Sequence, residues 1–154
     1  MKPKVINNFM QLKIPSRSQN EAFARTAAAT FASQLDPTVE EINDIKAAVS
    51  EAVTNCIVHA YPDSIGGIEI IARIQNNDTF YIRIKDKGCG IADIKQAMLP
   101  LFTTCEQGER AGLGFAVMES FMDKLRVSSK PAKGGTGATG TTVTMTKRIK
   151  SRNE

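Results

Sequence analysis

The sequence predicts an α+β domain in which helices cover one face of a mixed, mostly antiparallel sheet. Residues 68–74 and 80–84 alternate apolar and polar side chains on either side of a turn at Asn76–Asp78, as a half-buried hairpin does. Residues 20–35 and 37–59 instead repeat apolar side chains every three or four positions, which is typical of amphipathic helices. Strands with polar outer faces and helices between them favour a two-layer sandwich.

The first half of the chain predicts one strand and two helices. A strand is expected over 9–14, and Ser18 to Glu21 has the spacing of a capping box that opens a helix. Asp36 is expected to be the N-cap of the second helix, with Pro37 at its first position, where no N–H is needed. The expected apolar stripe of the first helix is Phe23, Ala27, Phe31 and Leu35.

The second half predicts the hairpin, two further helical segments and two strands. A short helical segment is expected over 93–98, and a third helix begins near Gly112–Gly114. Strands are expected over 125–129 and 141–147, separated by a glycine-rich loop. We therefore expect a single domain over 1–147, followed by a solvated basic tail over 148–154.

Composition excludes several classes of function. The chain has 154 residues, 42% of them hydrophobic and 23% charged, and a net charge of +4. Its three cysteines lack CxxC spacing and it has one histidine, which argues against a zinc site or a disulfide framework. We expect a cytoplasmic protein, because the sequence has no export signal and no apolar run long enough to span a membrane. The sequence has no basic face interleaved with aromatic residues, so it does not predict nucleic-acid binding.

Glu51 and Asn55 form the first candidate site. They are four residues apart in the second predicted helix, so their side chains lie on one face. A carboxylate and an amide oxygen in that arrangement can serve Mg²⁺, which prefers hard oxygen ligands. The alternative interpretation is that Glu51, like Glu40 and Asp44, belongs to the solvated side of this helix.

Two glycine-containing segments form the other candidates. Asp86 ends a strand and is followed by Gly88 and Gly90; an aspartate there can accept a hydrogen bond from an amine such as that of adenine, and the glycines let the backbone approach a flat ring. Gly112 and Gly114 open a helix whose free N–H groups suit phosphates, with Arg110 beside them. Each segment taken alone is also compatible with an ordinary turn.

Two other nucleotide-binding patterns are excluded. Residues 135–140 read GTGATG, which fits the dinucleotide pattern GxGxxG, but the following residues predict a strand rather than the helix that this pattern requires. The pattern GxxxxGK[ST] of P-loop proteins does not occur.

The order of the three candidate segments resembles the ATP-binding superfamily of gyrase, Hsp90, histidine kinases and MutL. Within it, the segments SQNEAFAR (18–25), SEAVTN (50–55), PLFTT (100–104), RAGLGF (110–115) and MESFMD (118–123) resemble the anti-sigma F factors of spore-forming bacteria. This resemblance implies the Bergerat ATP-binding fold. It also implies a protein-serine kinase that inhibits a sporulation sigma factor and phosphorylates a serine of an anti-anti-sigma protein.

The resemblance also implies roles for individual residues, with ATP and Mg²⁺ as the ligands. Glu51 would be the general base and Asn55 the Mg²⁺ ligand, Asp86 would contact the adenine amine, and a mobile lid would span 99–109. The remaining expected nucleotide-binding residues are Gly88, Gly90, Thr103, Thr104, Arg110, Gly112, Leu113, Gly114 and Thr142. A homodimer is implied as well, and His59 is either a partner of Asn55 or a helix-end residue.

Two alternative functions stay open. The chain can be a nucleotide-gated module that binds a sigma factor without significant catalysis, for which Glu51 is not required. It can also be a stress-response anti-sigma kinase with a different sigma partner, because physical reasoning from the sequence does not identify the partner.

Overall fold

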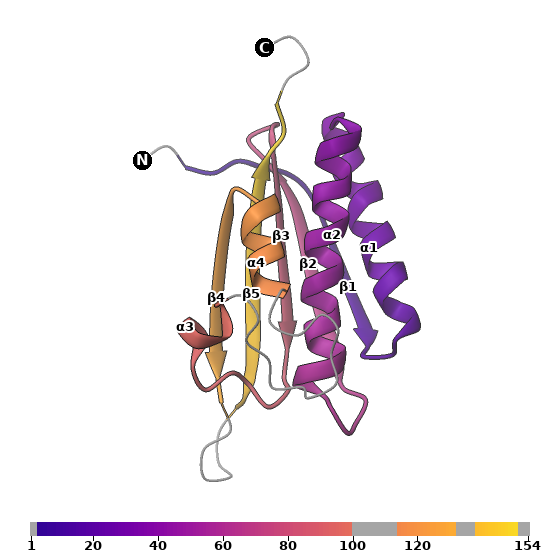
Figure 1. Cartoon of the computed structure of the whole chain (residues 1–154). Coiled ribbons are helices and arrows are strands. Elements are labelled where there is room, and N and C mark those ends of the chain that lie inside the picture. Colours follow the sequence, from indigo (N-terminus) through magenta and orange to yellow (C-terminus); the bar gives the residue numbers. More distant parts are fainter. Residues whose placement is uncertain (1–2, 100–113, 132–137, 151–154) are drawn as a thin grey trace.

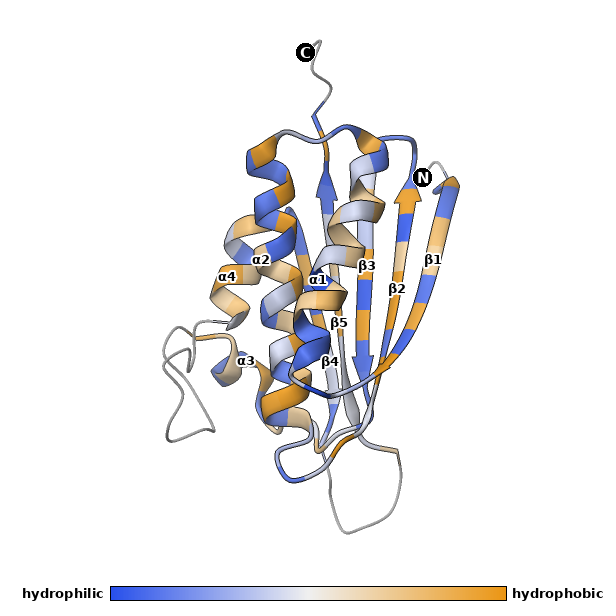
Figure 2. Ribbon diagram, turned by 90° about the vertical axis from the view of Figure 1, so that its right-hand side faces the viewer, coloured by the Kyte–Doolittle hydropathy of each residue, from blue (hydrophilic) through white to orange (hydrophobic). Residues whose placement is uncertain are grey.

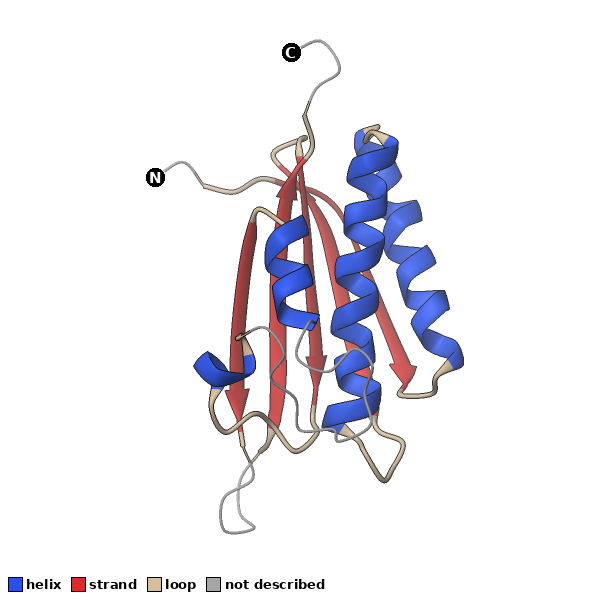
Figure 3. Cartoon of the chain, viewed as in Figure 1, coloured by secondary structure: helices blue, strands red, loops and turns tan. Residues whose placement is uncertain are grey.

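A five-stranded sheet forms one layer of the molecule and helices form the other, as Figures 1 and 3 show. A computed structural model describes residues 3–99, 114–131 and 138–150. In chain order the elements are β1 (Ile6–Pro15), α1 (Gln19–Ala32), the 3₁₀ turn η1 (Ser33–Leu35), α2 (Val39–Asn55), the π-helical turn η2 (Cys56–Ala60), β2 (Gly67–Gln75), β3 (Thr79–Asp86), α3 (Ile94–Ala97), α4 (Gly114–Phe121), β4 (Lys124–Lys130) and β5 (Gly140–Arg148).

The strands lie in the order β1-β2-β3-β5-β4, and every neighbouring pair is antiparallel. The predicted α+β sandwich with helices on one face is confirmed. The expectation of a mixed sheet is wrong for the described part of the chain, where the strands form no parallel pair. The β4–β5 hairpin returns β5 alongside β3, so β5 runs opposite to both of its neighbours.

The β2–β3 hairpin buries one face, as the alternation of its residues predicts. Asn76 and Asn77 in its turn have φ of 54° and 58°, a left-handed conformation that asparagine tolerates better than most residues. Figure 2 shows the alternating hydropathy along the strands and the helices that cover one side of the sheet. The buried residues of the hairpin include Ile68, Ile70, Ala72, Ile74, Phe80, Ile82 and Ile84.

The predicted apolar stripe of the first helix is confirmed in part. Phe31 and Leu35 pack against the core, whereas Phe23, also expected there, is 53% exposed. The fully buried positions of α1 are instead Ala24, Ala28 and Ala32, each at most 1% exposed. Alanine side chains let α1 pack close to α2, and a phenylalanine would hold the two helices further apart.

The starts of both long helices also differ from the predicted ones. Ser18 has helical backbone angles and its side chain makes no capping hydrogen bond, so residues 18–21 do not form a capping box. Asp36 is left-handed, with φ of 53° at the end of η1, which excludes it as an N-cap. Thr38 caps α2 instead: Glu41 N donates to Thr38 Oγ1 (3.1 Å) and Thr38 N donates to Glu41 Oε1 (2.9 Å). The capping box therefore occurs at the second helix.

The packed part of the chain continues beyond the expected boundary at Lys147. Arg148 is the last residue of β5 and its Nε lies 3.0 Å from Asp78 Oδ2. Ile149 is 4% exposed, and the backbone N–H of Lys150 donates to Glu41 Oε2 at 3.1 Å. Residues 148–150 are thus held against the domain rather than forming a solvated tail. None of the helices in the described ranges is long and apolar enough to cross a membrane.

Burial along α2 predicts the effect of truncating its side chains. Ile45 is fully buried, whereas Val39 on the same helix is 78% exposed. We expect Ile45→Ala to lower the free energy of unfolding by about 2–5 kcal/mol, because it leaves a cavity, and Val39→Ala to change it by less than about 0.5 kcal/mol. Chemical denaturation of both variants measures this, and equal losses would contradict the assigned burial.

Candidate functional site

Asp86 ends the central strand β3 with its side chain buried. The residue is 5% exposed. Its Oδ1 accepts hydrogen bonds from the backbone N–H of Gly88 (2.9 Å) and of Thr141 (3.2 Å), and its Oδ2 accepts one from the Cys56 thiol (3.5 Å). One carboxylate therefore joins the end of β3, the turn after it, the start of β5 and the start of η2.

Burial raises the pKa of Asp86 above the ordinary aspartate value, because it disfavours the charged form. The hydrogen bonds from Gly88, Thr141 and Cys56 act in the opposite direction and offset part of this effect. Burial and the neighbouring Asp86 charge raise the pKa of the Cys56 thiol well above its usual range. Cys56 thus stays protonated and can donate to the carboxylate at neutral pH.

The turn after Asp86 is anchored on the end of η2. Cys89 N donates to Ala60 O (3.1 Å) and Cys89 Sγ donates to His59 O (3.2 Å), so the turn pairs with carbonyls that the end of a helix leaves free. A Cβ at Gly88 would lie 2.3 Å from Ala60 O, and Gly90 has φ of +77°. Both glycines are therefore required by the path of the backbone here.

Glu51 and Asn55 face the N-terminus of α4. A Cβ built on Gly114 would lie 3.3 Å from Asn55 Oδ1 and 3.4 Å from Glu51 Oε2. Both side chains belong to α2, and neither residue is fully exposed. The predicted pair thus lies together beside a helix N-terminus, where backbone N–H groups and the helix dipole favour an anion.

Thr141 lies at the site, and Thr142, the expected residue, does not. Successive side chains of a strand point to opposite faces, and in β5 the helix-facing positions are Thr141, Val143 and Met145, all buried. Thr142 pairs with Lys85 and Ser128, two exposed residues on the other face of the sheet. Thr142 was expected from the resemblance to the family, whereas the alternation of side chains along β5 points Thr141 toward the helices.

A cavity of about 580 Å³ lies beside these residues, and Glu51 is outside the set of described residues that line it. Apolar side chains from three parts of the chain, Ile91, Phe115 and Val143, line it together with Asp86. Asn55 and Gly114 also belong to its wall. The cavity suits a ligand with a flat ring and an exocyclic amine, because Asp86 can accept a hydrogen bond from such an amine. An anionic group joined to the ring would lie beside α4.

The described part of the site offers few protein ligands for a metal. No group of three or more His, Cys, Asp or Glu side chains able to hold a metal occurs in the described ranges. Mg²⁺ fits such a site, since it usually keeps several waters and binds through one or two protein oxygens plus substrate phosphates. Asn55 Oδ1 is an oxygen of this kind.

Several predicted site residues lie outside the residues that the structure describes. They are Thr103, Thr104, Arg110, Gly112 and Leu113, and with them most of the expected lid over 99–109. Their assignments stay predictions.

No motif predicted a role for Cys56, and two roles were open for His59. Both line the cavity from η2. Burial lowers the pKa of His59, so its imidazole is neutral at physiological pH. No local pattern in the sequence marks Cys56, because its hydrogen-bond partner Asp86 lies 30 positions away.

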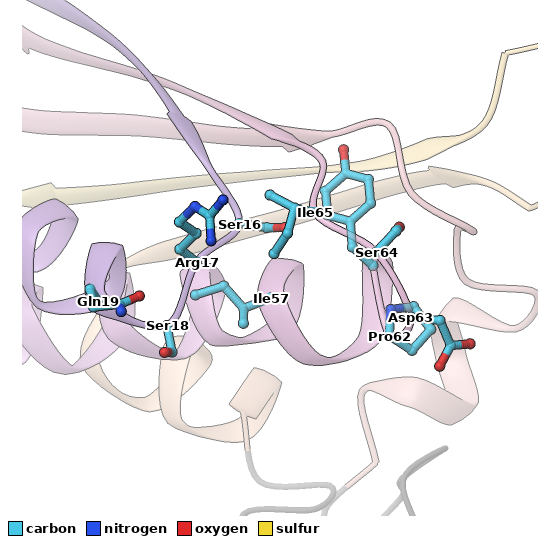
Figure 4. A pocket seen from close by; sticks show the side chains of 10 residues that line it. Ser16, Arg17, Ser18, Gln19, Ile57, Pro62, Asp63, Ser64 and Ile65 are labelled. Atoms are coloured by element: carbon cyan, nitrogen blue, oxygen red, sulfur yellow. The ribbon is translucent and has the colours of Figure 1, made fainter.

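A second cavity, of about 440 Å³, lies beside the β1–α1 connection. Figure 4 shows residues 16–19 and the loop before β2 around it, with Ile57 between them. It contains none of the predicted site residues, so we assign the site to the larger cavity.

Comparison with known proteins identifies the family of the chain. Residues 14–147 match the histidine kinase-like ATPase domain family. The chain is 59% identical over 143 residues to the anti-sigma F factor of Caldanaerobacter subterraneus subsp. tengcongensis, which covers 93% of this chain and 95% of that protein. It is 47% identical over 148 residues to the anti-sigma F factor of Pasteuria penetrans, covering 95% of each.

Among solved structures, the RsbU and RsbW domains of Rv1364c from Mycobacterium tuberculosis superpose with a TM-score of 0.63 at 19% identity. The match covers 93% of this chain and 32% of that longer chain, and at this identity it shows the fold alone. The identities to the curated relatives extend over nearly the whole length of both proteins. The chain therefore belongs to the anti-sigma F factor family of histidine kinase-like ATPase domains.

Proposed function

We propose that the chain binds ATP with Mg²⁺ in the larger cavity and is a protein-serine kinase and anti-sigma factor. The observation that carries this proposal is the arrangement of Glu51 and Asn55 against the N-terminus of α4, beside a cavity that contains the buried Asp86. Family membership supports it, because the relatives are named anti-sigma F factors.

Asp86 is the proposed recognition group for the base. Its Oδ1 is already bonded to two backbone N–H groups, so Oδ2 is the better acceptor for the amine of adenine. Thr141 replaces Thr142 in our assignment of the residues at this end of the site.

Asn55 is the proposed Mg²⁺ ligand, and the N-terminus of α4 the proposed phosphate site. When bound, Mg²⁺ neutralises charge on the phosphates. From the resemblance in sequence, Arg110, Gly112, Leu113 and Gly114 would bind phosphates, and Thr103 and Thr104 would belong to the segment that covers them.

Glu51 is the proposed general base. Its carboxylate would take the proton of the acceptor serine hydroxyl while the serine oxygen forms a bond to the γ-phosphorus. The bond between that phosphorus and the bridging oxygen breaks, and ADP leaves. A positioned base contributes about 10²–10⁴-fold to such a step.

The proposed protein partners are a sporulation sigma factor, which the chain holds inactive, and an anti-anti-sigma protein, which supplies the serine. We also propose that the chain acts in the cytoplasm as a homodimer. These assignments rest on the names of the relatives and on the sequence motifs, and sedimentation of the purified protein tests the dimer.

Replacing Glu51 with Gln tests the enzyme. We expect Glu51→Gln to lower phosphate transfer from γ-labelled ATP to serine of the anti-anti-sigma protein by about 10²–10⁴-fold, with ATP affinity nearly unchanged. Label on the acceptor and calorimetric titration with ATP measure the two quantities.

Glu40→Gln is the matched control, because Glu40 is an exposed residue of the same helix, and it should transfer phosphate at the wild-type rate. Unchanged transfer by Glu51→Gln would remove its assigned role. Wild-type protein that binds ATP and the sigma factor but phosphorylates nothing would leave a nucleotide-gated sigma-binding module. Preference for another sigma factor would indicate the stress-response branch.

The two neighbouring threonines of β5 give a separate test. We expect Thr141→Val to weaken ATP binding by about 3- to 10-fold through the loss of one hydroxyl in the cavity wall. Thr142→Val, on the opposite face, should bind ATP like the wild type. The opposite order of effects, measured by calorimetry, would restore Thr142 to the site.

The raised pKa of Asp86 predicts how ATP binding depends on pH. Protonation of the Asp86 carboxylate removes an acceptor for the hydrogen bond from the adenine amine. ATP affinity is therefore present above the pKa of Asp86 and is lost as the pH falls through that pKa. Because burial raises the pKa, the loss should begin at a higher pH than for an exposed aspartate. His59 lines the same cavity, so the comparison is with Asp86→Asn, which keeps His59 and should bind more weakly without this step. Parallel curves for the two proteins would contradict the assignment.

A further inference from the structure

Cys56 contacts Asp86 from the helical layer. It is the first residue of η2 and is 3% exposed, and its Sγ donates to Asp86 Oδ2 at 3.5 Å. Both residues line the same cavity. The thiol is therefore part of the immediate surroundings of the carboxylate that faces the ligand.

The two oxygens of Asp86 have different surroundings. Oδ1 accepts from two backbone N–H groups, whereas the thiol is the described hydrogen-bond donor to Oδ2. A carboxylate oxygen has room for about two donors. Oδ2 thus keeps acceptor capacity for a ligand while the thiol holds its position.

The thiol is suited to this task because it is a weak donor. Its sulfur donates to Asp86 Oδ2 across 3.5 Å and leaves room at that oxygen for a second donor. Rotation of an aspartate carboxylate about its last bond has only a broad preference. Donors to both oxygens, from the backbone on one side and Cys56 on the other, fix that rotation.

Resting on the proposed ATP site, we propose that Cys56 is a positioning residue that holds Asp86 Oδ2 in place to discriminate 6-amino purines from 6-oxo purines. The amine of adenine donates to Oδ2. The carbonyl oxygen of guanine in the same place has no hydrogen to donate and is repelled by the carboxylate. A carboxylate free to rotate makes both the attraction and the repulsion weaker.

The test compares ATP and GTP binding, each with Mg²⁺, to wild-type protein and to Cys56→Ala and Cys56→Ser in calorimetric titrations. These two variants differ only by a hydroxyl. We expect Cys56→Ala to bind ATP about 3- to 10-fold more weakly and GTP nearly as before, so the preference for ATP falls. Cys56→Ser, which restores a donor, should recover most of that preference.

Val53→Ala is the control for simple loss of packing. Val53 is fully buried on the same helix one turn earlier and does not line the cavity. Its truncation should lower stability and leave the ratio of ATP to GTP affinity unchanged. An unchanged ratio in Cys56→Ala, or the same altered ratio in Cys56→Ala, Cys56→Ser and Val53→Ala, would overturn the role of Cys56.

Wild-type protein separates this inference from the proposed function. If wild-type protein binds ATP but the ratio of ATP to GTP affinity is the same in the Cys56 variants, only the role of Cys56 is lost. If it binds neither nucleotide, the ATP site is wrong and the inference is overturned with it.

Discussion

The buried carboxylate of Asp86 is the constraint around which the site is built. A charged group in such a position is costly unless donors surround it, and here the donors come from a turn, from the first residues of β5 and from the start of η2. None of the three is adjacent to another in sequence. The local fold must bring them together for the carboxylate to be tolerated, and the carboxylate in turn holds them at the mouth of the cavity.

Helix α2 and its continuation η2 connect the two chemical parts of the site. Glu51 and Asn55 lie on regular helix beside α4, whereas Cys56 and His59 lie on the π-helical turn. A π-helical turn changes the direction in which the following side chains point, and such turns are frequent at functional sites. One continuous segment therefore presents side-chain oxygens beside α4 and a thiol toward the end of β3.

The sequence was a reliable guide where one simple rule governed the structure, and a poor one where tertiary packing decided between neighbouring residues. Alternation alone predicted which side chains of the β2–β3 hairpin are buried. Helical periodicity predicted that Glu51 and Asn55 lie together. In the predicted stripe of the first helix, Phe31 and Leu35 pack against the core but Phe23 does not. Thr142 was expected from the resemblance to the family, and the alternation of β5 places Thr141 at the cavity instead. Cys56 was missed because its partner lies 30 positions away.

The place of β5 in the sheet has a consequence for how the protein is made. This strand lies between β3 and β4, yet it follows both of them in the sequence. Until β5 has been synthesised, β3 presents an unpaired edge, β4 has no neighbour, and Asp86 lacks the donor from Thr141. A nascent chain that still lacks β5 thus has a strand edge open to mispairing and an incomplete wall around the larger cavity.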